Sequence, residues 1–257
     1  MSYENILFET RDNIARITLN RPDKLNALSM HLLEEFHDAL RIIARSPDTR
    51  ALIITGAGRA FAAGLDLTAK RPEDPDALLR DYFTPSYALL KDLSIPTIAA
   101  VNGPSVGAAM SMALSCDIVV AAKSAYFLAA FVNIALVPDN GASWFLPHSI
   151  GYARAMGMLM LGERLPAEQA AEWGLVWKCV EDDQLAEVTD AMARKLAAGP
   201  STTYAYIKRM VAKSITNDLP IQIGLENEYQ RMLRGSPNVV EAITAFAEKR
   251  PPKFGVR

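Results

Sequence analysis

The chain has 257 residues, of which 50% are hydrophobic, and its formal net charge is −2 at pH 7. This length allows one large domain, or one domain with an appendage, around a sizeable core. A net charge so close to zero excludes a global field that attracts nucleic acid or an anionic membrane. We find no signal-peptide pattern and no membrane-length apolar run, and two cysteines in apolar runs favour a reduced, cytoplasmic protein.

Strand and helix patterns alternate through the first 95 residues. The predicted elements are strands over 6–10 and 14–19, a helix between Ser29 and Pro47, a strand over 51–55, a charged loop over 70–76 and a helix over 76–93. The first two strands flank a short polar turn and predict a β-hairpin. Ser29 is the predicted N-cap, because its hydroxyl can accept a hydrogen bond from a helical N–H that has no other partner.

The stretch from residue 96 to 122 organises the rest of the chain. It predicts a buried strand over 97–101, a turn of small residues over 102–107, an apolar helix from Ala108 and a second strand from Asp117. Two interpretations fit the turn. The helix N-terminus can hold an anion, or an oxygen that becomes one, through its unpaired N–H groups. Alternatively, the small residues serve only the close packing of strand against helix.

The pattern changes in the second half of the chain. It predicts helices over 152–161 and from Pro166 to Gly174, a strand over 175–180, and helices alone from about Asp182 onward. We therefore predict an α/β core over residues 1–198 and a helical segment over residues 199–257.

One motif suggests a serine hydrolase. Gly103-Pro104-Ser105-Val106-Gly107 matches G-x-S-x-G between a strand and a helix, the context of a nucleophile elbow. A catalytic triad would then need His148 as its base, with Asp117 or Asp139 as its acid. No lipase-type oxyanion motif precedes Ser105, which weakens this alternative.

Two glycine-containing segments suggest a different chemistry. Gly64-Leu65 and Gly107-Ala108 each follow a buried strand and contain small residues. One backbone N–H from each segment could converge on a single carbonyl oxygen. Such a pair of donors stabilises the enolate of a thioester.

The chain resembles the crotonase (enoyl-CoA hydratase/isomerase) superfamily along nearly its whole length. The matching stretches are NRPDKLNALS, ALIITGAGRAFAAGLDL, IPTIAAVNGPSVGAAMSMALSCDIVVAA, IALVPDNGASWFLP, LGERLPAEQAAEWGLV and FAEKRPPKF. The resemblance implies a spiral of ββα turns with a C-terminal helical trimerisation segment. It also implies acyl-CoA thioester substrates, no cofactor apart from the coenzyme A of the substrate, and a homotrimer or a dimer of trimers. No Cys/His cluster has metal-ligand spacing, so we expect no metal.

The resemblance also assigns site residues. It implies that the N–H groups of Leu65 and Ala108 form the oxyanion hole. The residues that it places around coenzyme A, or in the turn beside it, are Lys24, Ala27, Ala62, Ala63, Gly64, Asp66, Gly107, Lys253 and Phe254. For Asp66 we favour a structural hydrogen bond that fixes the turn. Lys253 and Phe254 would reach coenzyme A from a neighbouring subunit.

The departures from the family pattern bear on the reaction. Hydratases of the family use two glutamates, and this chain has Ser111 and Phe131 in their places. Adding water to a double bond needs one group to activate water and another to protonate carbon, and these side chains cannot do both. The resemblance therefore argues against a two-glutamate hydratase.

Asp139 is the remaining candidate acid/base. Its apolar neighbours predict that burial raises its pKa. Alternatively, it only caps a helix that starts near Gly141. The segment VPDNGASWFLP resembles that of family isomerases, especially those of the phenylacetate pathway that act on ring epoxides. We therefore predict an acyl-CoA isomerase with Asp139 as its single acid/base. The alternatives are a hydratase of altered mechanism, an aryl-CoA dehalogenase with Asp139 as nucleophile, an acyl-CoA binder without catalysis, and the serine hydrolase.

Overall fold

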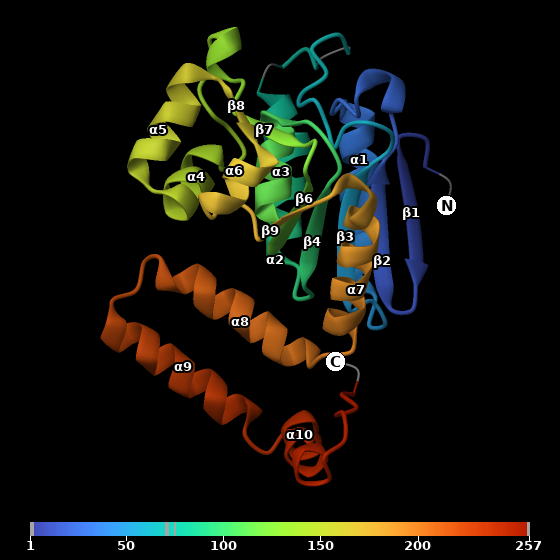
Figure 1. Cartoon of the computed structure of the whole chain (residues 1–257), viewed down its shortest axis with the longest axis vertical. Helices are drawn as coiled ribbons and strands as arrows, with labels where there is room; N and C mark the ends of the chain where they lie inside the picture. Colours follow the sequence, from blue (N-terminus) through green and yellow to red (C-terminus); the bar gives the residue numbers. More distant parts are fainter. Residues whose placement is uncertain (1–2, 70–71, 75, 256–257) are drawn as a thin grey trace.

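A six-stranded sheet forms the centre of the structure, which is a computed structural model that describes residues 3–69, 72–74 and 76–255 (Figure 1). In spatial order its strands are β1 (Ile6–Arg11), β2 (Ile14–Leu19), β3 (Ala51–Gly56), β4 (Thr97–Val101), β6 (Ile118–Ala122) and β9 (Lys178–Val180). β1 is antiparallel to β2, and every other neighbouring pair is parallel. Parallel strands are covered on both faces, which explains the continuous apolar runs of β3 and β4.

The predicted β-hairpin is confirmed. Arg11 pairs with Ile14, and the two turn residues Asp12 and Asn13 have φ angles of 52° and 63°. Asp and Asn tolerate this left-handed conformation better than most residues, and a two-residue turn of this kind fits the twist of the flanking strands.

A second, small sheet consists of β5 (Ser105–Val106), β7 (Tyr126–Leu128) and β8 (Arg164–Pro166). The sequence did not predict these strands, because runs of two or three residues are too short to show an alternating pattern. β7 pairs in parallel with β5 and antiparallel with β8.

The described part of the chain contains ten α-helices and several shorter helical turns. The α-helices are α1 (Met30–Arg45), α2 (Thr84–Asp92), α3 (Ala108–Ser115), α4 (Ala142–Ile150), α5 (Tyr152–Leu161), α6 (Ala167–Glu172), α7 (Leu185–Ala197), α8 (Ser201–Ser214), α9 (Leu219–Leu233) and α10 (Pro237–Ala247). The shorter turns are η1 (Pro22–Lys24), η2 (Leu78–Phe83), η3 (Val132–Ile134) and η4 (Asp182–Gln184). None of the helices described is long and apolar enough to cross a membrane.

The helix predictions hold with local corrections. Ser29 is the N-cap of α1, since its Oγ accepts a hydrogen bond from Leu32 N at 3.2 Å. The helix predicted over 76–93 is a π-helical turn, η2, followed by α2. Of the loop predicted over 70–76, residues 70, 71 and 75 lie outside the described residues.

The strand predicted over 175–180 is too long. Only Lys178–Val180 pair in the sheet, as β9. Leu175 N instead donates to Ala170 O at 2.9 Å, so this residue completes the turn that ends α6 after Gly174 (φ 81°).

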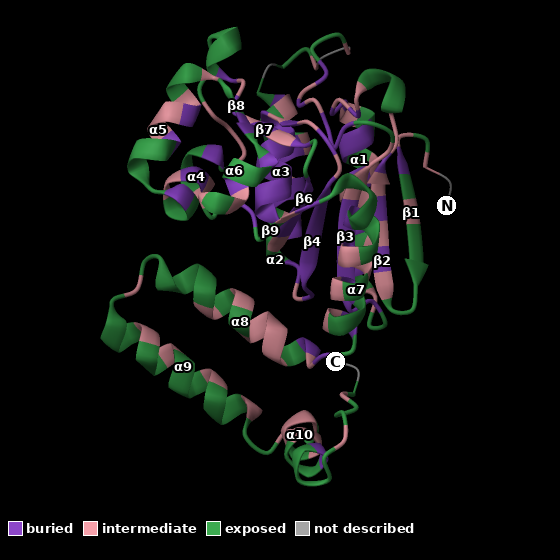
Figure 2. Cartoon of the chain, viewed as in Figure 1, coloured by how far each residue is buried: buried purple, intermediate pink, exposed green. Residues whose placement is uncertain are grey.

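The last three helices extend from the core and are mostly exposed (Figure 2). The predicted division near residue 198 falls between α7, which packs on the main sheet, and α8. That the two parts are separate units stays a prediction.

Lys208 connects α8 to the core. Its Nζ lies 2.8 Å from Asp117 Oδ2 and donates to Ile95 O at 2.9 Å. The two charged side chains are only 15% and 19% exposed, so solvent screens this pair less than a surface pair.

We expect Lys208→Met to lower the free energy of unfolding by about 1–3 kcal/mol, because it leaves the Asp117 carboxylate and the Ile95 carbonyl short of a donor. Urea unfolding measures the change. The control is Lys213→Met, which replaces an exposed lysine of the same helix. Equal effects of the two variants would contradict a connecting role for Lys208.

Candidate active site

The loops that follow β3 and β4 run side by side. Ala62 and Ser105 form a parallel bridge, with backbone hydrogen bonds of 3.0 and 3.1 Å on its two sides. Leu65 and Ala108 each lie three residues beyond this bridge, at matching positions of the two segments. β3 and β4 are parallel neighbours, so their carboxyl ends deliver both loops to the same edge of the sheet.

The N–H groups of Leu65 and Ala108 have no acceptor among the described residues. By contrast, the N–H groups of Ala63, Asp66 and Gly107 donate to backbone carbonyls at 2.8–3.0 Å. Ala108 is the first residue of α3, where the N–H lies outside the helical hydrogen-bond pattern and the helix dipole is positive. Two free donors on adjacent segments can bind one oxygen that carries negative charge.

Gly64 allows the close approach of the two segments. A Cβ at this position would lie 2.8 Å from Val106 O, and its φ of 88° is unfavourable for other residues. Gly107, just before α3, has a φ of 53°, but a Cβ there would meet nothing within 4 Å. Gly64 is therefore required by space and by conformation, and Gly107 by conformation alone.

Asp66 fixes the turn that carries Leu65. Its carboxylate accepts hydrogen bonds from Thr68 N (3.0 Å), Thr68 Oγ1 (2.7 Å) and Ala69 N (3.1 Å), and it pairs with Arg21 at 2.9 Å. Burial alone would raise the pKa of Asp66, but the bonds from Thr68 and Arg21 outweigh it and lower the pKa to about 2. The structural interpretation of Asp66 fits these contacts. No local pattern predicts the role of Arg21, since the pair spans 45 positions.

The loop predicted to contact coenzyme A packs against the same turn. Ala63 N donates to Leu25 O at 2.9 Å, and Leu28 N donates to Gly64 O at 2.7 Å. Lys24 is exposed on this loop, and Ala27 is half-buried. The structure thus brings together the residues predicted at 24, 27, 62–64 and 66. That they bind coenzyme A stays a prediction.

Asn26 holds this loop and was missed from the sequence. Its buried amide donates to Ala57 O (2.9 Å) and to Ala60 O (2.8 Å), and it accepts from Arg21 N at 2.9 Å. Its backbone is left-handed, with a φ of 54°. An asparagine in a loop carries no sequence pattern that separates such a role from an ordinary turn residue.

Lys253 and Phe254 lie far from this cluster within one chain. Phe254 O accepts a hydrogen bond of 3.4 Å from Arg50, which precedes β3 and so lies at the opposite end of that strand from the site. Lys253 N donates to Glu241 at 2.7 Å. That these residues reach coenzyme A from a neighbouring subunit stays a prediction.

Asp139 lies between η3 and α4, and its side chain does not cap the helix. Gly141 is the residue before α4, and only the backbone carbonyl of Asp139 bonds to the helix, at 3.0 Å from Ala142 N. The carboxylate accepts a hydrogen bond from Asn140 Nδ2 at 2.8 Å. The N-cap alternative is therefore wrong. Burial raises the pKa of Asp139, and the bond from Asn140 opposes this in part.

Ser111 and Phe131 occupy the positions at which hydratases of the resembled family have glutamates. Ser111, in the first turn of α3, donates through Oγ to Asp139 O at 3.3 Å. This contact brings Asp139 against the helix that begins with Ala108. Phe131 is buried, with 7% of its surface exposed. Asp139 is the carboxylate that these contacts bring to this end of α3.

The serine hydrolase alternative is wrong. Ser105 is fully buried, and its Oγ has no hydrogen-bond partner among the described residues. His148 is exposed on α4, with Nδ1 2.6 Å from Trp144 O. Asp117 pairs with Lys208. No base contacts the hydroxyl, so the nucleophile would not be activated.

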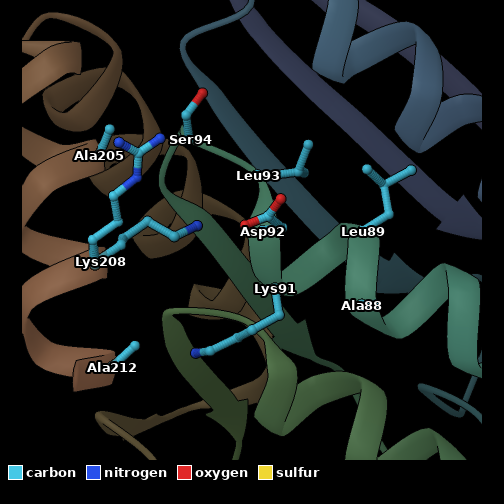
Figure 3. A pocket seen from close by; sticks show the side chains of 10 residues that line it. Ala88, Leu89, Lys91, Asp92, Leu93, Ser94, Ala205, Lys208 and Ala212 are labelled. Atoms are coloured by element: carbon cyan, nitrogen blue, oxygen red, sulfur yellow. The ribbon is translucent and has the colours of Figure 1, made fainter.

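A cavity of about 550 Å³ lies elsewhere, between α2 and α8 (Figure 3). Lys91 from α2 and Lys208 from α8 lie on its opposite walls. Lys208 is already paired with Asp117, and the lining contains none of the candidate site residues. The volume of a cavity therefore does not identify the candidate active site. That site is defined by the N–H groups of Leu65 and Ala108 and by the half-buried carboxylate of Asp139.

Comparisons with known proteins identify the family of the chain. The family model described as enoyl-CoA hydratase/isomerase matches residues 9–257. A probable enoyl-CoA hydratase of Rhodobacter capsulatus is 41% identical over 256 residues, covering 99% of each chain. The 1,2-epoxyphenylacetyl-CoA isomerase of Escherichia coli is 40% identical over 258 residues, covering 98% of each.

Solved structures agree as well. The crystal structure of an enoyl-CoA hydratase from Bacillus anthracis has a TM-score of 0.93 and 31% identity, and the match covers 98% of this chain and 99% of the other. Because sequence and structure match over nearly the whole chain, this protein belongs to the enoyl-CoA hydratase/isomerase family and is an enzyme of the crotonase superfamily, with the predicted crotonase fold.

Proposed function

We propose that this protein is an acyl-CoA isomerase that moves a double bond, or isomerises a ring epoxide, through a thioester enolate. The observation that carries the proposal is the position of Asp139, a half-buried carboxylate of raised pKa held against α3. At the start of that helix lie the free N–H of Ala108 and, on the adjacent segment, that of Leu65. A base beside two oxyanion donors suits proton abstraction next to a thioester carbonyl.

The proposed reaction with a 3-enoyl-CoA uses one carboxylate twice. The thioester oxygen binds the N–H groups of Leu65 and Ala108, each worth about 3–4 kcal/mol in the transition state. Asp139 removes a proton from C2, and the electrons of that bond pass into the enolate, which extends over the double bond. Asp139 then returns the proton to C4, and the double bond lies between C2 and C3. No atom is gained or lost.

The absence of carboxylates at positions 111 and 131 supports isomerisation over hydration. Hydration needs separate groups for water and for carbon. Ser111 directs its hydroxyl to a backbone carbonyl, and Phe131 is buried and apolar. One acid/base suffices for a proton that leaves and returns.

The substrate proposal extends to the acyl group. The Escherichia coli relative is named for 1,2-epoxyphenylacetyl-CoA, and we propose a ring epoxide of this class, as in phenylacetate breakdown, beside unsaturated acyl groups. Coenzyme A would lie on the loop of Lys24 and Ala27 and on the turn of residues 62–64.

We also propose a homotrimer or a dimer of trimers. The last three helices expose large apolar side chains that a single chain leaves uncovered, and such patches mark protein interfaces. Prominent among them are Val211, Leu219, Ile221, Met232, Ile243 and Phe246. Light scattering on the full chain should give three or six times the mass of one chain. A mass of one chain at micromolar concentration would contradict the proposal.

We expect Asp139→Asn to slow double-bond movement at least about 100-fold, because it removes the acid/base. Proton NMR in D2O follows a 3-enoyl-CoA and the deuterium that enters its acyl chain. Binding of coenzyme A thioesters should persist, since Asn keeps the shape of the side chain.

The same spectra separate the alternatives. Formation of a 3-hydroxyacyl-CoA by the wild type would indicate a hydratase. Tight binding with neither reaction nor deuterium uptake, for the 3-enoyl-CoA and for the ring epoxide, would indicate a binder. Unchanged turnover by Asp139→Asn would remove Asp139 from the mechanism.

A pH profile tests the environment of Asp139. The Asn140 amide donates to the charged carboxylate and so lowers the pKa of Asp139. Asn140→Gly removes this donor and tolerates the left-handed backbone at this position (φ 49°). A base must be ionised, and activity falls as pH drops through its pKa. The acid limb of kcat/KM should therefore move to higher pH in Asn140→Gly, and an unmoved limb would contradict the assignment.

A further inference from the structure

Tyr87 is a buried polar side chain that the reaction above does not use. It lies on α2, only 6% of its surface is exposed, and its hydroxyl donates to Ala108 O at 2.7 Å. We propose that Tyr87 is a positioning residue: by binding the Ala108 carbonyl it anchors the first residue of α3, and with it the place of the Ala108 N–H. The inference rests on the proposed function only in that this N–H binds the thioester oxygen.

The first turn of α3 has few other constraints on that N–H. The preceding Gly107 has backbone angles of 53° and −123°, and a Cβ there would meet no neighbour. The peptide that carries the Ala108 N–H is held at its carbonyl by Ser111 N, at 3.2 Å. That distance is at the long end for such a bond, whereas 2.7 Å is typical of a firm O–H···O bond. Tyr87 binds the following carbonyl, that of Ala108, and so restrains the Ala108 backbone from which the N–H extends.

Tyr87 is itself held firmly. Phe83 and Tyr87 lie four residues apart and so share one face of the helical segment, with ring centroids 5.9 Å apart. A π-helical turn over Leu78–Phe83 directly precedes α2. Burial, and to a lesser degree the charge of Asp139, raise the pKa of Tyr87 well above its usual value. The phenol therefore keeps its proton and remains a donor.

The position of Tyr87 also relates the two halves of the site. Tyr87 donates to Ala108 O, and Ser111, one turn later on α3, donates to Asp139 O. The start of α3 is thus held on one side by α2, through Tyr87, and contacts the Asp139 loop on another. A small shift of Ala108 would move the oxyanion donor relative to the base, and misplacement of about 1 Å can slow catalysis about 100-fold.

The test compares Tyr87→Phe with a matched control, Ser86→Ala. Phe keeps the ring and removes only the hydroxyl. Ser86 is also buried on α2, but its hydroxyl donates to Tyr82 O at 2.8 Å, within the same helical segment. Each full-length variant is assayed with a 3-enoyl-CoA. Each is also examined by infrared difference spectroscopy with bound hexanoyl-CoA that carries 13C at the thioester carbonyl.

We expect Tyr87→Phe to lower kcat about 5–20-fold with KM changed less than about twofold, because the donor acts mainly in the transition state. Oxyanion donors polarise the carbonyl, so the wild type should shift its band to lower frequency on binding. The shift should shrink in Tyr87→Phe and stay complete in Ser86→Ala.

Two outcomes would overturn the inference. One is a Tyr87→Phe variant with the full band shift and full kcat. The other is equal loss in both variants, in proportion to their melting temperatures, which would indicate a structural role alone. If the wild type moves no double bond, but Tyr87→Phe alone loses the band shift, the positioning role stands and the proposed isomerase does not.

Discussion

The candidate site depends on the parallel contact between the loops that follow β3 and β4. The bridge at Ala62 and Ser105 sets the register, and Gly64 lets the two backbones approach. Beyond the bridge the amides of Ala63, Asp66 and Gly107 donate to backbone carbonyls, while those of Leu65 and Ala108 have no acceptor among the described residues. An N–H without an acceptor costs free energy when it is buried, so such a pair is retained where a ligand oxygen can accept from it. The contacts of Arg21, Asn26 and Asp66 all hold this arrangement.

The type of reaction then depends on the side chains that lie at the start of α3. An oxyanion hole alone activates a thioester, and the reaction is decided by the acid/base groups nearby. Here the contacts bring one carboxylate, Asp139, whose burial favours the protonated form and whose neighbour Asn140 favours the ionised one. Opposed effects of this kind keep a carboxylate able both to take up and to release a proton.

The strands of the main sheet were predictable because hydrophobic runs and turn residues are local signals. The family resemblance predicted Leu65 and Ala108, and the structure adds why their amides are free. Contacts between distant positions left no such signal: Arg21 with Asp66, and Tyr87 with Ala108. The alternative that Asp139 only caps α4 is wrong because left-handed Gly141 precedes α4 while Asn140 binds the carboxylate. A strand of two residues, such as β5, is too short to show an alternation of apolar and polar residues.

The most direct test is a crystal structure of the protein with an unreactive saturated acyl-CoA thioester. The account predicts that the thioester oxygen lies about 3 Å from both Leu65 N and Ala108 N. It also predicts the Asp139 carboxylate beside C2 of the acyl chain. A thioester oxygen bound to neither amide, with coenzyme A ordered in the same crystal, would contradict the account, because the two free donors would then have no part in holding the substrate.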